Sequence, residues 1–66
     1  MNRERLAGRI RQRRQQLGLS VKELAKRAGV SASYIYAIEA GMRGSSIEKL
    51  SAIAKELNIP IQTLLE

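Results

Sequence analysis

Residues 21–38 read VKELAKRAGVSASYIYAI and contain two short helical patterns separated by Gly29. Ala25 is small at the position where the second helix of such a pair crosses the first. Gly29 supplies a left-handed turn residue at no steric cost. Ile35 and Ile38 then lock the second helix against the body of the domain. This pattern predicts a helix-turn-helix, whose second helix is held out from the body so that it can enter a DNA major groove.

Turn signals divide the rest of the chain into further short helices. The first carries Leu6, Ile10 and Leu17 at helical spacing and ends at Gly18. Ser20 begins the second helix, where its pairing with a glutamate three residues later forms a capping box. The third begins at Ser31 and ends at Gly41.

A fourth helix begins near Ser45 or Ser46 and ends at Asn58. Pro60 opens a short fifth. The apolar stripes of these two helices contain Ile47, Leu50, Ile53, Ala54, Leu57, Ile61, Leu64 and Leu65. No window alternates with a period of two, so we expect an all-α fold of five helices in a single domain over residues 1–66.

The composition excludes several classes of protein. The chain has 66 residues without Cys or His, so disulfides, thiolate metal sites and histidine catalysis are absent. Its six glutamates are scattered and no phosphate-cradling loop occurs, so we expect neither an enzyme nor a bound metal, cofactor or small-molecule ligand. With no long apolar run, a cytoplasmic, nucleoid-associated protein without a membrane partner is expected.

Positive charge is concentrated in the first half of the chain. The net charge is +6, and residues 1–28 hold nine basic and two acidic residues. Such asymmetry favours a polyanion as partner, although a merely solvated helix face would also explain it. A membrane-lying helix over residues 3–17 is disfavoured, because its apolar stripe is narrow and lacks Trp and Phe.

Residues 10–65 resemble the lambda-repressor/Cro-like helix-turn-helix regulators, also called the Xre family. The resemblance rests on residues 16–20 (QLGLS), 23–25 (ELA), 28–31 (AGVS), 34–35 (YI), 38–41 (IEAG) and on Leu50, Ala54 and Leu57. It implies a five-helix fold that binds a double-stranded DNA operator, usually as a homodimer. The expected function is sequence-specific transcriptional regulation, with repression from a palindromic operator as its form.

One charged pair is predicted from helical position. Arg14 lies on the apolar stripe of its helix, between Ile10 and Leu17, and Glu39 lies four residues after Ile35. An isolated buried charge is very costly, so the two are expected to meet. The family resemblance also implies this pair. The alternative is that both charged tips reach water along the surface.

The outward face of the third helix supplies the predicted base contacts. Placing Ile35, Ile38 and Met42 inward turns Ser33, Tyr36, Ala37 and Ala40 outward, with Ala32 and Tyr34 on the flanks. The candidates for base contacts are Ala32, Ser33, Tyr36 and Ala37. No Asn, Gln or Arg stands on this helix, and many family members carry Gln where Val21 and Ala32 stand here. We therefore expect a larger contribution from operator shape.

Phosphate contacts are predicted at helix N-termini, where free N–H groups and the helix dipole favour anions, and in the loop after the third helix. The candidates are Ser20, Val21, Lys22, Ser31, Tyr34 and Arg43. For the tyrosines of the third helix, the alternative is partial packing on the surface of the domain. Arg9, Arg11 and Arg13 either reach flanking phosphates or remain solvated. About five neutralised phosphates per protomer would give a log–log salt slope near −4 to −5.

The sequence leaves two alternatives to double-stranded DNA binding, and it also predicts a dimer interface. Gly41 and Gly44 match the Gly-x-x-Gly clamp of KH RNA-binding domains, but those domains need strands. A protein-interaction module on the same fold, antitoxin-like or bridging, is the chief rival to DNA binding. The predicted dimer interface consists of Ile59, Ile61, Leu64 and Leu65; the alternative is that these residues only close the core.

Overall fold

Five α-helices form the structure of the chain. The computed structural model describes residues 2–66, with α1 at Arg3–Gln16, α2 at Val21–Ala28, α3 at Ala32–Glu39, α4 at Ile47–Glu56 and α5 at Ile61–Leu65. These residues form no strand, so the all-α prediction is confirmed. None of the described helices is long and apolar enough to cross a membrane, since the longest has 14 residues.

Local capping signals place the helix ends. Ser20 and Glu23 form both bonds of a capping box at the start of α2, and Ser31 accepts the Tyr34 N–H at the start of α3. Ser46, rather than its neighbour, caps α4. Gly29 has φ of +72°, the left-handed conformation that lets the chain turn sharply between α2 and α3. The predicted helix-turn-helix geometry therefore follows from local sequence.

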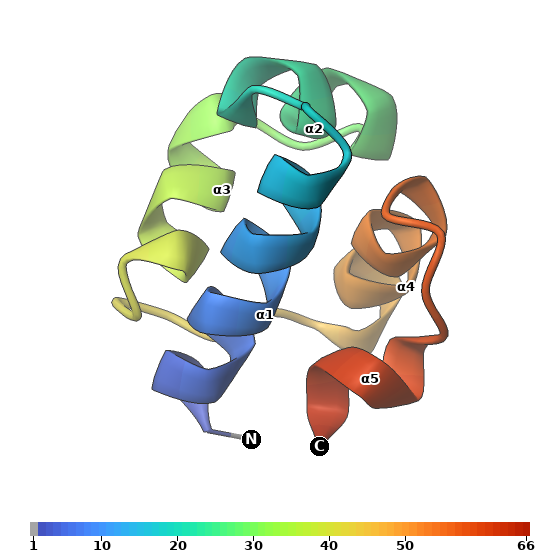
Figure 1. Cartoon of the computed structure of the whole chain (residues 1–66). Helices are drawn as coiled ribbons and strands as arrows, with labels where there is room; N and C mark the ends of the chain where they lie inside the picture. Colours follow the sequence, from blue (N-terminus) through green and yellow to red (C-terminus); the bar gives the residue numbers. More distant parts are fainter. Residues whose placement is uncertain (1) are drawn as a thin grey trace.

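The elements are arranged around α1. In Figure 1, α1 lies between α3 on one side and α4 and α5 on the other, and α2 crosses one end. Helix α2 contacts both α3 and α4, while α1 contacts α3 and α5. The start of α1 and the end of α5 lie at the same end of the molecule (Figure 1). Helix α3 is thus carried on one side of the body by α1 and α2.

Aliphatic side chains fill the centre. The largest fully buried side chains are Leu6, Ile10, Leu24, Ile35, Ile38, Leu50, Ile53, Leu57 and Leu64. They come from all five helices, so every helix contributes to one shared core. Because each helix is too short to be stable alone, its stability depends on this packing.

Two residues assigned inward from the sequence face solvent. Met42 is 72% exposed because the left-handed turn at Gly41 ends the helical spacing of α3 before the chain reaches it. Ile47 is 57% exposed because, as the first residue of α4, it lies before the point where the helix meets the core. The stripe of α4 therefore begins at Leu50.

We expect Leu24→Ala and Leu50→Ala each to lower the free energy of unfolding by about 2–5 kcal/mol, because each change removes a fully buried side chain and leaves a cavity. Denaturant unfolding provides the measurement. Ile47→Ala is the matched control on the helix of Leu50, and its exposed side chain predicts a change within about 0.5 kcal/mol. Equal losses for Leu50→Ala and Ile47→Ala would contradict this core.

Candidate nucleic-acid interface

A buried ion pair ties the end of α3 to α1. Arg14 Nε donates to Glu39 Oε2 at 2.8 Å, and Nη2 donates to Oε1 at 2.9 Å, so the two planar groups meet through two parallel bonds. The Arg14 side chain is 13% exposed and that of Glu39 is 8% exposed. The structure thus brings together the two charges that the sequence placed on inward faces, and only a small part of each side chain remains exposed.

The Arg14 guanidinium also connects this pair to the turn before α2. Its Nη1 donates to the Leu19 carbonyl oxygen at 2.8 Å. Hydrogen bonding to the Glu39 carboxylate raises the pKa of Arg14 and outweighs the opposing effect of burial. Arg14 therefore stays charged and joins α1, the α1–α2 turn and α3 at one point.

The outward face of α3 is open to solvent and carries no acid. Ser33, Tyr36 and Ala40 are exposed, and Ala32 and Ala37 are half-buried. Tyr36 is 57% exposed, so more than half of the surface of this residue is available to a partner. The lone acidic residue of α3 is Glu39, and its carboxylate is turned inward to Arg14. This face can accept an anionic surface without charge repulsion.

Tyr34 lies inward rather than on the flank of α3. It stands four residues before Ile38, so both side chains project from the same stripe of the helix. Its side chain is 8% exposed, and its hydroxyl is hydrogen-bonded to the Ser45 hydroxyl in the loop before α4. This burial keeps the ring away from the outer surface, where the sequence had suggested a phosphate contact.

The N-terminus of α2 keeps donors for an anion. Ser20 Oγ accepts the Glu23 N–H and Glu23 Oε1 accepts the Ser20 N–H, which leaves the N–H groups of Val21 and Lys22 without a partner inside the helix. The Val21 side chain is buried, so only its backbone can reach a ligand. Hydrogen bonds from the backbone N–H and the side chain of Ser20 lower the pKa of the Glu23 carboxyl, which stays ionised at neutral pH and accepts the Ser20 N–H.

The N-terminus of α3 is organised in a similar way. Ser31 Oγ accepts the Tyr34 N–H at 3.0 Å. Because an accepting hydroxyl keeps its own proton, Ser31 can still donate to a phosphate oxygen. Ser31 and Lys22 are both exposed.

Two cations lie over the aromatic ring of Tyr34, which belongs to α3. Arg43 Cζ lies 4.5 Å from the centroid of the Tyr34 ring, and Lys49 Nζ lies 4.7 Å from it. The sequence predicted a role for Arg43 but overlooked Lys49. Lys49 stands three residues after the Ser46 cap, on the first turn of α4, and this position could have indicated an anion contact from the sequence. The meeting of Lys49 with Tyr34 is a tertiary contact that spacing does not reveal.

Several arginines of α1 bind the C-terminal ends of other helices. Arg11 Nη1 donates to the Glu39 carbonyl oxygen at the end of α3, at 3.4 Å. Arg13 Nε donates to the Leu57 carbonyl oxygen at the end of α4, at 2.8 Å, and Arg9 donates to the Glu66 carbonyl oxygen after α5. The Glu39 and Leu57 carbonyls lack helical partners and carry partial negative charge. Part of the positive charge of α1 therefore stabilises the fold itself.

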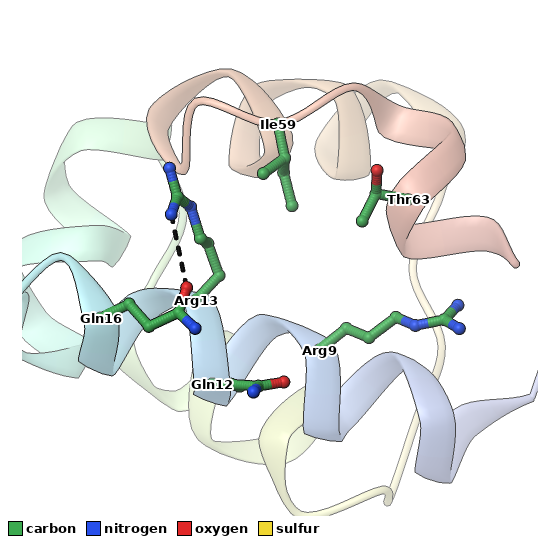
Figure 2. Close-up of a pocket in the computed structure, with 6 residues that line it drawn as sticks. All are labelled: Arg9, Gln12, Arg13, Gln16, Ile59 and Thr63. Atoms are coloured by element: carbon green, nitrogen blue, oxygen red, sulfur yellow. Dashed lines mark hydrogen bonds between the residues drawn. The ribbon is translucent and has the colours of Figure 1, made fainter.

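A groove of about 330 Å³ lies on the side of the molecule where α1 meets the α4–α5 connection and α5. Figure 2 shows the residues that line it, which are Arg9, Gln12, Arg13, Gln16, Ile59 and Thr63. Both arginines already donate to backbone carbonyls, and Arg13 also bonds the Gln16 side chain at 3.3 Å (Figure 2). The groove is distant from the outward face of α3, on the other side of α1.

The apolar residues near the C-terminal end have different environments. Leu64 is fully buried within its own chain, because α5 turns it toward α1 and α4, so it closes the core instead of facing a partner. Ile59 and Ile61 are half-buried against the core. Leu65 is exposed. Of the four residues predicted for the dimer interface, Leu65 is the one that offers a large exposed apolar side chain.

We expect Glu39→Ala alone to destabilise the fold by about 3–5 kcal/mol, because it leaves the mostly buried Arg14 without its carboxylate. The double variant with Arg14→Met and Glu39→Leu replaces both charges by apolar groups and is expected to cost far less, about 1 kcal/mol or below. Thermal melts and denaturant unfolding of both proteins give the comparison. Equal stability of the two variants would contradict a buried pair.

Comparisons with known proteins agree with this architecture. The family described as Helix-turn-helix matches residues 10–64. The HTH-type transcriptional regulator SinR of Bacillus subtilis is 39% identical over 59 residues, which cover 88% of this chain and 53% of that protein. The chain spans between 39% and 53% of the length of the curated relatives it matches.

Solved structures also share the fold, those of SinR and C.AhdI among them. A crystal structure of SinR, the master regulator for biofilm formation, in complex with DNA has a TM-score of 0.89 at 37% identity, covering 92% of this chain and 98% of that one. The restriction-modification controller protein C.AhdI from Aeromonas hydrophila has a TM-score of 0.90 at 31% identity, covering 94% of each chain. The match extends over all five helices and includes the helix-turn-helix. The chain belongs to the lambda-repressor-like (Xre) helix-turn-helix family of transcriptional regulators.

Proposed function

We propose that this chain binds double-stranded DNA in a sequence-specific manner and inserts α3 into the major groove. The observation that carries the proposal is the acid-free outward face of α3, produced by turning Glu39 inward to Arg14. An α-helix fits the major groove, where a surface acid would be repelled by the phosphates. The similarity to a SinR structure in complex with DNA supports the same mode of binding.

Backbone contacts would orient α3 in the groove. The open N–H groups of Val21 and Lys22, the hydroxyls of Ser20 and Ser31, and the exposed Arg43 are the donors we assign to phosphates. They lie at the N-termini of α2 and α3 and in the loop that connects α3 to α4. Phosphate contacts of this kind fix the register of a protein on the duplex without reading its sequence.

Base reading would depend on few polar groups. Ser33 and Tyr36 can each hydrogen-bond a base edge, while Ala32 and Ala37 offer methyl surface to thymine. This set lacks the bidentate contacts that Asn or Gln makes to adenine and Arg makes to guanine. Operator shape and deformability would therefore supply a substantial part of the specificity.

The proposed biological unit is a homodimer on a palindromic operator. Two copies related by a two-fold axis would place their α3 helices one DNA turn apart, about 10 base pairs between half-site centres. The exposed Leu65, with the half-buried Ile59 and Ile61, is the surface we assign to this contact. A dimer that covers a promoter in this way would act as a repressor by excluding polymerase.

A protein-interaction module is the second candidate. It is favoured by the exposed Tyr36 ring and by the lack of Asn, Gln and Arg on α3, because exposed tyrosines are typical of protein interfaces. Selection of bound duplexes from a random pool separates DNA binding from the protein-interaction module.

We expect selection from a pool of random duplexes to recover a defined site with the wild-type chain. Ser33→Ala and Tyr36→Ala are each expected to lose preference at particular base pairs, by about 1–3 kcal/mol, because each removes a base-edge contact. Ser51→Ala, an exposed serine on α4, is the matched control and should leave the preferences unchanged. Unchanged preferences in the α3 variants would mean that other residues read the bases. Absence of salt-dependent binding to any duplex would favour the protein-interaction module.

For the dimer, light scattering should give the mass of two protomers on one selected duplex. Leu65→Lys is expected to weaken this assembly because it places a charge in the apolar contact, whereas Gln62→Lys adds the same charge at an exposed polar position of α5. A monomer mass both with and without the duplex would contradict the dimer, and equal effects of the two lysines would exclude Leu65 from its interface.

A further inference from the structure

The cluster around Tyr34 joins three parts of the chain. The ring comes from α3, Arg43 and Ser45 come from the α3–α4 loop, and Lys49 comes from the first turn of α4. The ring is almost fully buried and its hydroxyl is bonded to Ser45, so its position is fixed by the fold. Both cations, in contrast, belong to exposed residues.

The two cations on this ring have no acid to neutralise them. The negative face of an aromatic ring attracts each cation, but the two positive charges repel one another. Within residues 2–66 the salt bridge is Arg14–Glu39, and no carboxylate lies within 4.0 Å of the charged group of Arg43 or Lys49. An anion that contacts both would remove the repulsion and add charge-assisted hydrogen bonds.

A DNA phosphate is the anion that the position of the cluster favours. Arg43 stands in the loop that follows α3 and Lys49 on the first turn of α4, so the backbone of a duplex that receives α3 would pass near both cations. A phosphodiester has two unesterified oxygens, which suits one guanidinium and one ammonium. Tyr34 itself is too buried to reach this phosphate.

We propose that Tyr34 is a positioning residue that holds Arg43 and Lys49 together as a clamp for one backbone phosphate of bound DNA. The inference rests on the proposed DNA-binding function and adds Lys49 to its contacts. It replaces a direct phosphate contact by Tyr34 with an indirect role. Ring attraction orders two long side chains before binding, so less conformational entropy is lost when the phosphate arrives.

The first test counts phosphates through the salt dependence of binding to a mixed pool of duplexes. If Arg43 and Lys49 share one phosphate, the Arg43→Gln, Lys49→Gln double variant reduces the log–log slope by about 0.9, whereas two separate phosphates would give about 1.8. Lys55→Gln, an exposed lysine at the other end of α4, is the matched control and should leave the slope unchanged. A reduction near 1.8, or none, would overturn the shared clamp.

The second test isolates the role of the ring. Tyr34→Leu keeps an apolar side chain but removes the ring, and it is expected to weaken binding on the order of tenfold. Tyr34→Phe keeps the ring and should bind almost as the wild type does. In the background that lacks both cations, Tyr34→Leu should have no further effect, because a positioning residue acts only through the groups it positions.

Thermal melts identify the temperature range in which every variant is folded, and binding is measured there. An equal loss from Tyr34→Leu with and without the two cations would show that the ring only supports the fold, and would overturn the proposal. If Tyr34→Leu does not fold, Tyr34→Phe is compared with the Arg43→Gln, Lys49→Gln double variant instead. The clamp proposal would be overturned if these two proteins bound DNA equally weakly. If the wild-type chain binds no duplex at all, the proposed function fails together with the clamp; if it binds and only the ring effect is absent, the clamp alone fails.

Discussion

The ion pair between Arg14 and Glu39 is the constraint on which the placement of α3 depends. Two bonds below 3 Å fix the end of α3 to α1, and a third bond from Arg14 fixes the turn that leads into α2. Since both charges are mostly withdrawn from water, the pair tolerates little displacement. The same contact removes the acidic charge of α3 from its outer face. One interaction therefore sets both the orientation of the helix and the charge of the surface that it presents.

The arginines of α1 have a role in the fold that net charge conceals. A basic first half suggests a polyanion partner, but Arg9, Arg11 and Arg13 donate to carbonyls at the ends of α5, α3 and α4. Cations are favourable at helix C-termini, where the unpaired carbonyls concentrate negative charge. The cations that we propose for an anionic ligand lie elsewhere, with Lys22 in α2, Arg43 in the α3–α4 loop and Lys49 in α4. In this proposal the position of the cations, more than their total number, distinguishes the binding surface.

Much of the fold could be predicted because its signals are local. Ser20 with Glu23, Gly29 and Ser31 mark helix ends through bonds within a few residues of each other, and the structure has these ends where expected. The apolar stripes also predicted the core, including Ile35, Ile38 and Leu50. Errors arose where a helical period was extended past its end, at Met42, or to the first residue of a helix, at Ile47. At such positions the backbone, and not the period, decides which way a side chain points.

The sequence by itself determined the five helices, the glycine turn and the two inward charges, because each depends on spacing along one segment. The tertiary structure alone decided which groups meet across segments. It buried Tyr34 under the α3–α4 loop, brought Lys49 to its ring, and directed the α1 arginines to distant helix ends. It also turned Leu64 into the core and left Leu65 outside. These outcomes depend on how five short helices pack together, and the energy of that packing belongs to pairs of segments rather than to any one of them.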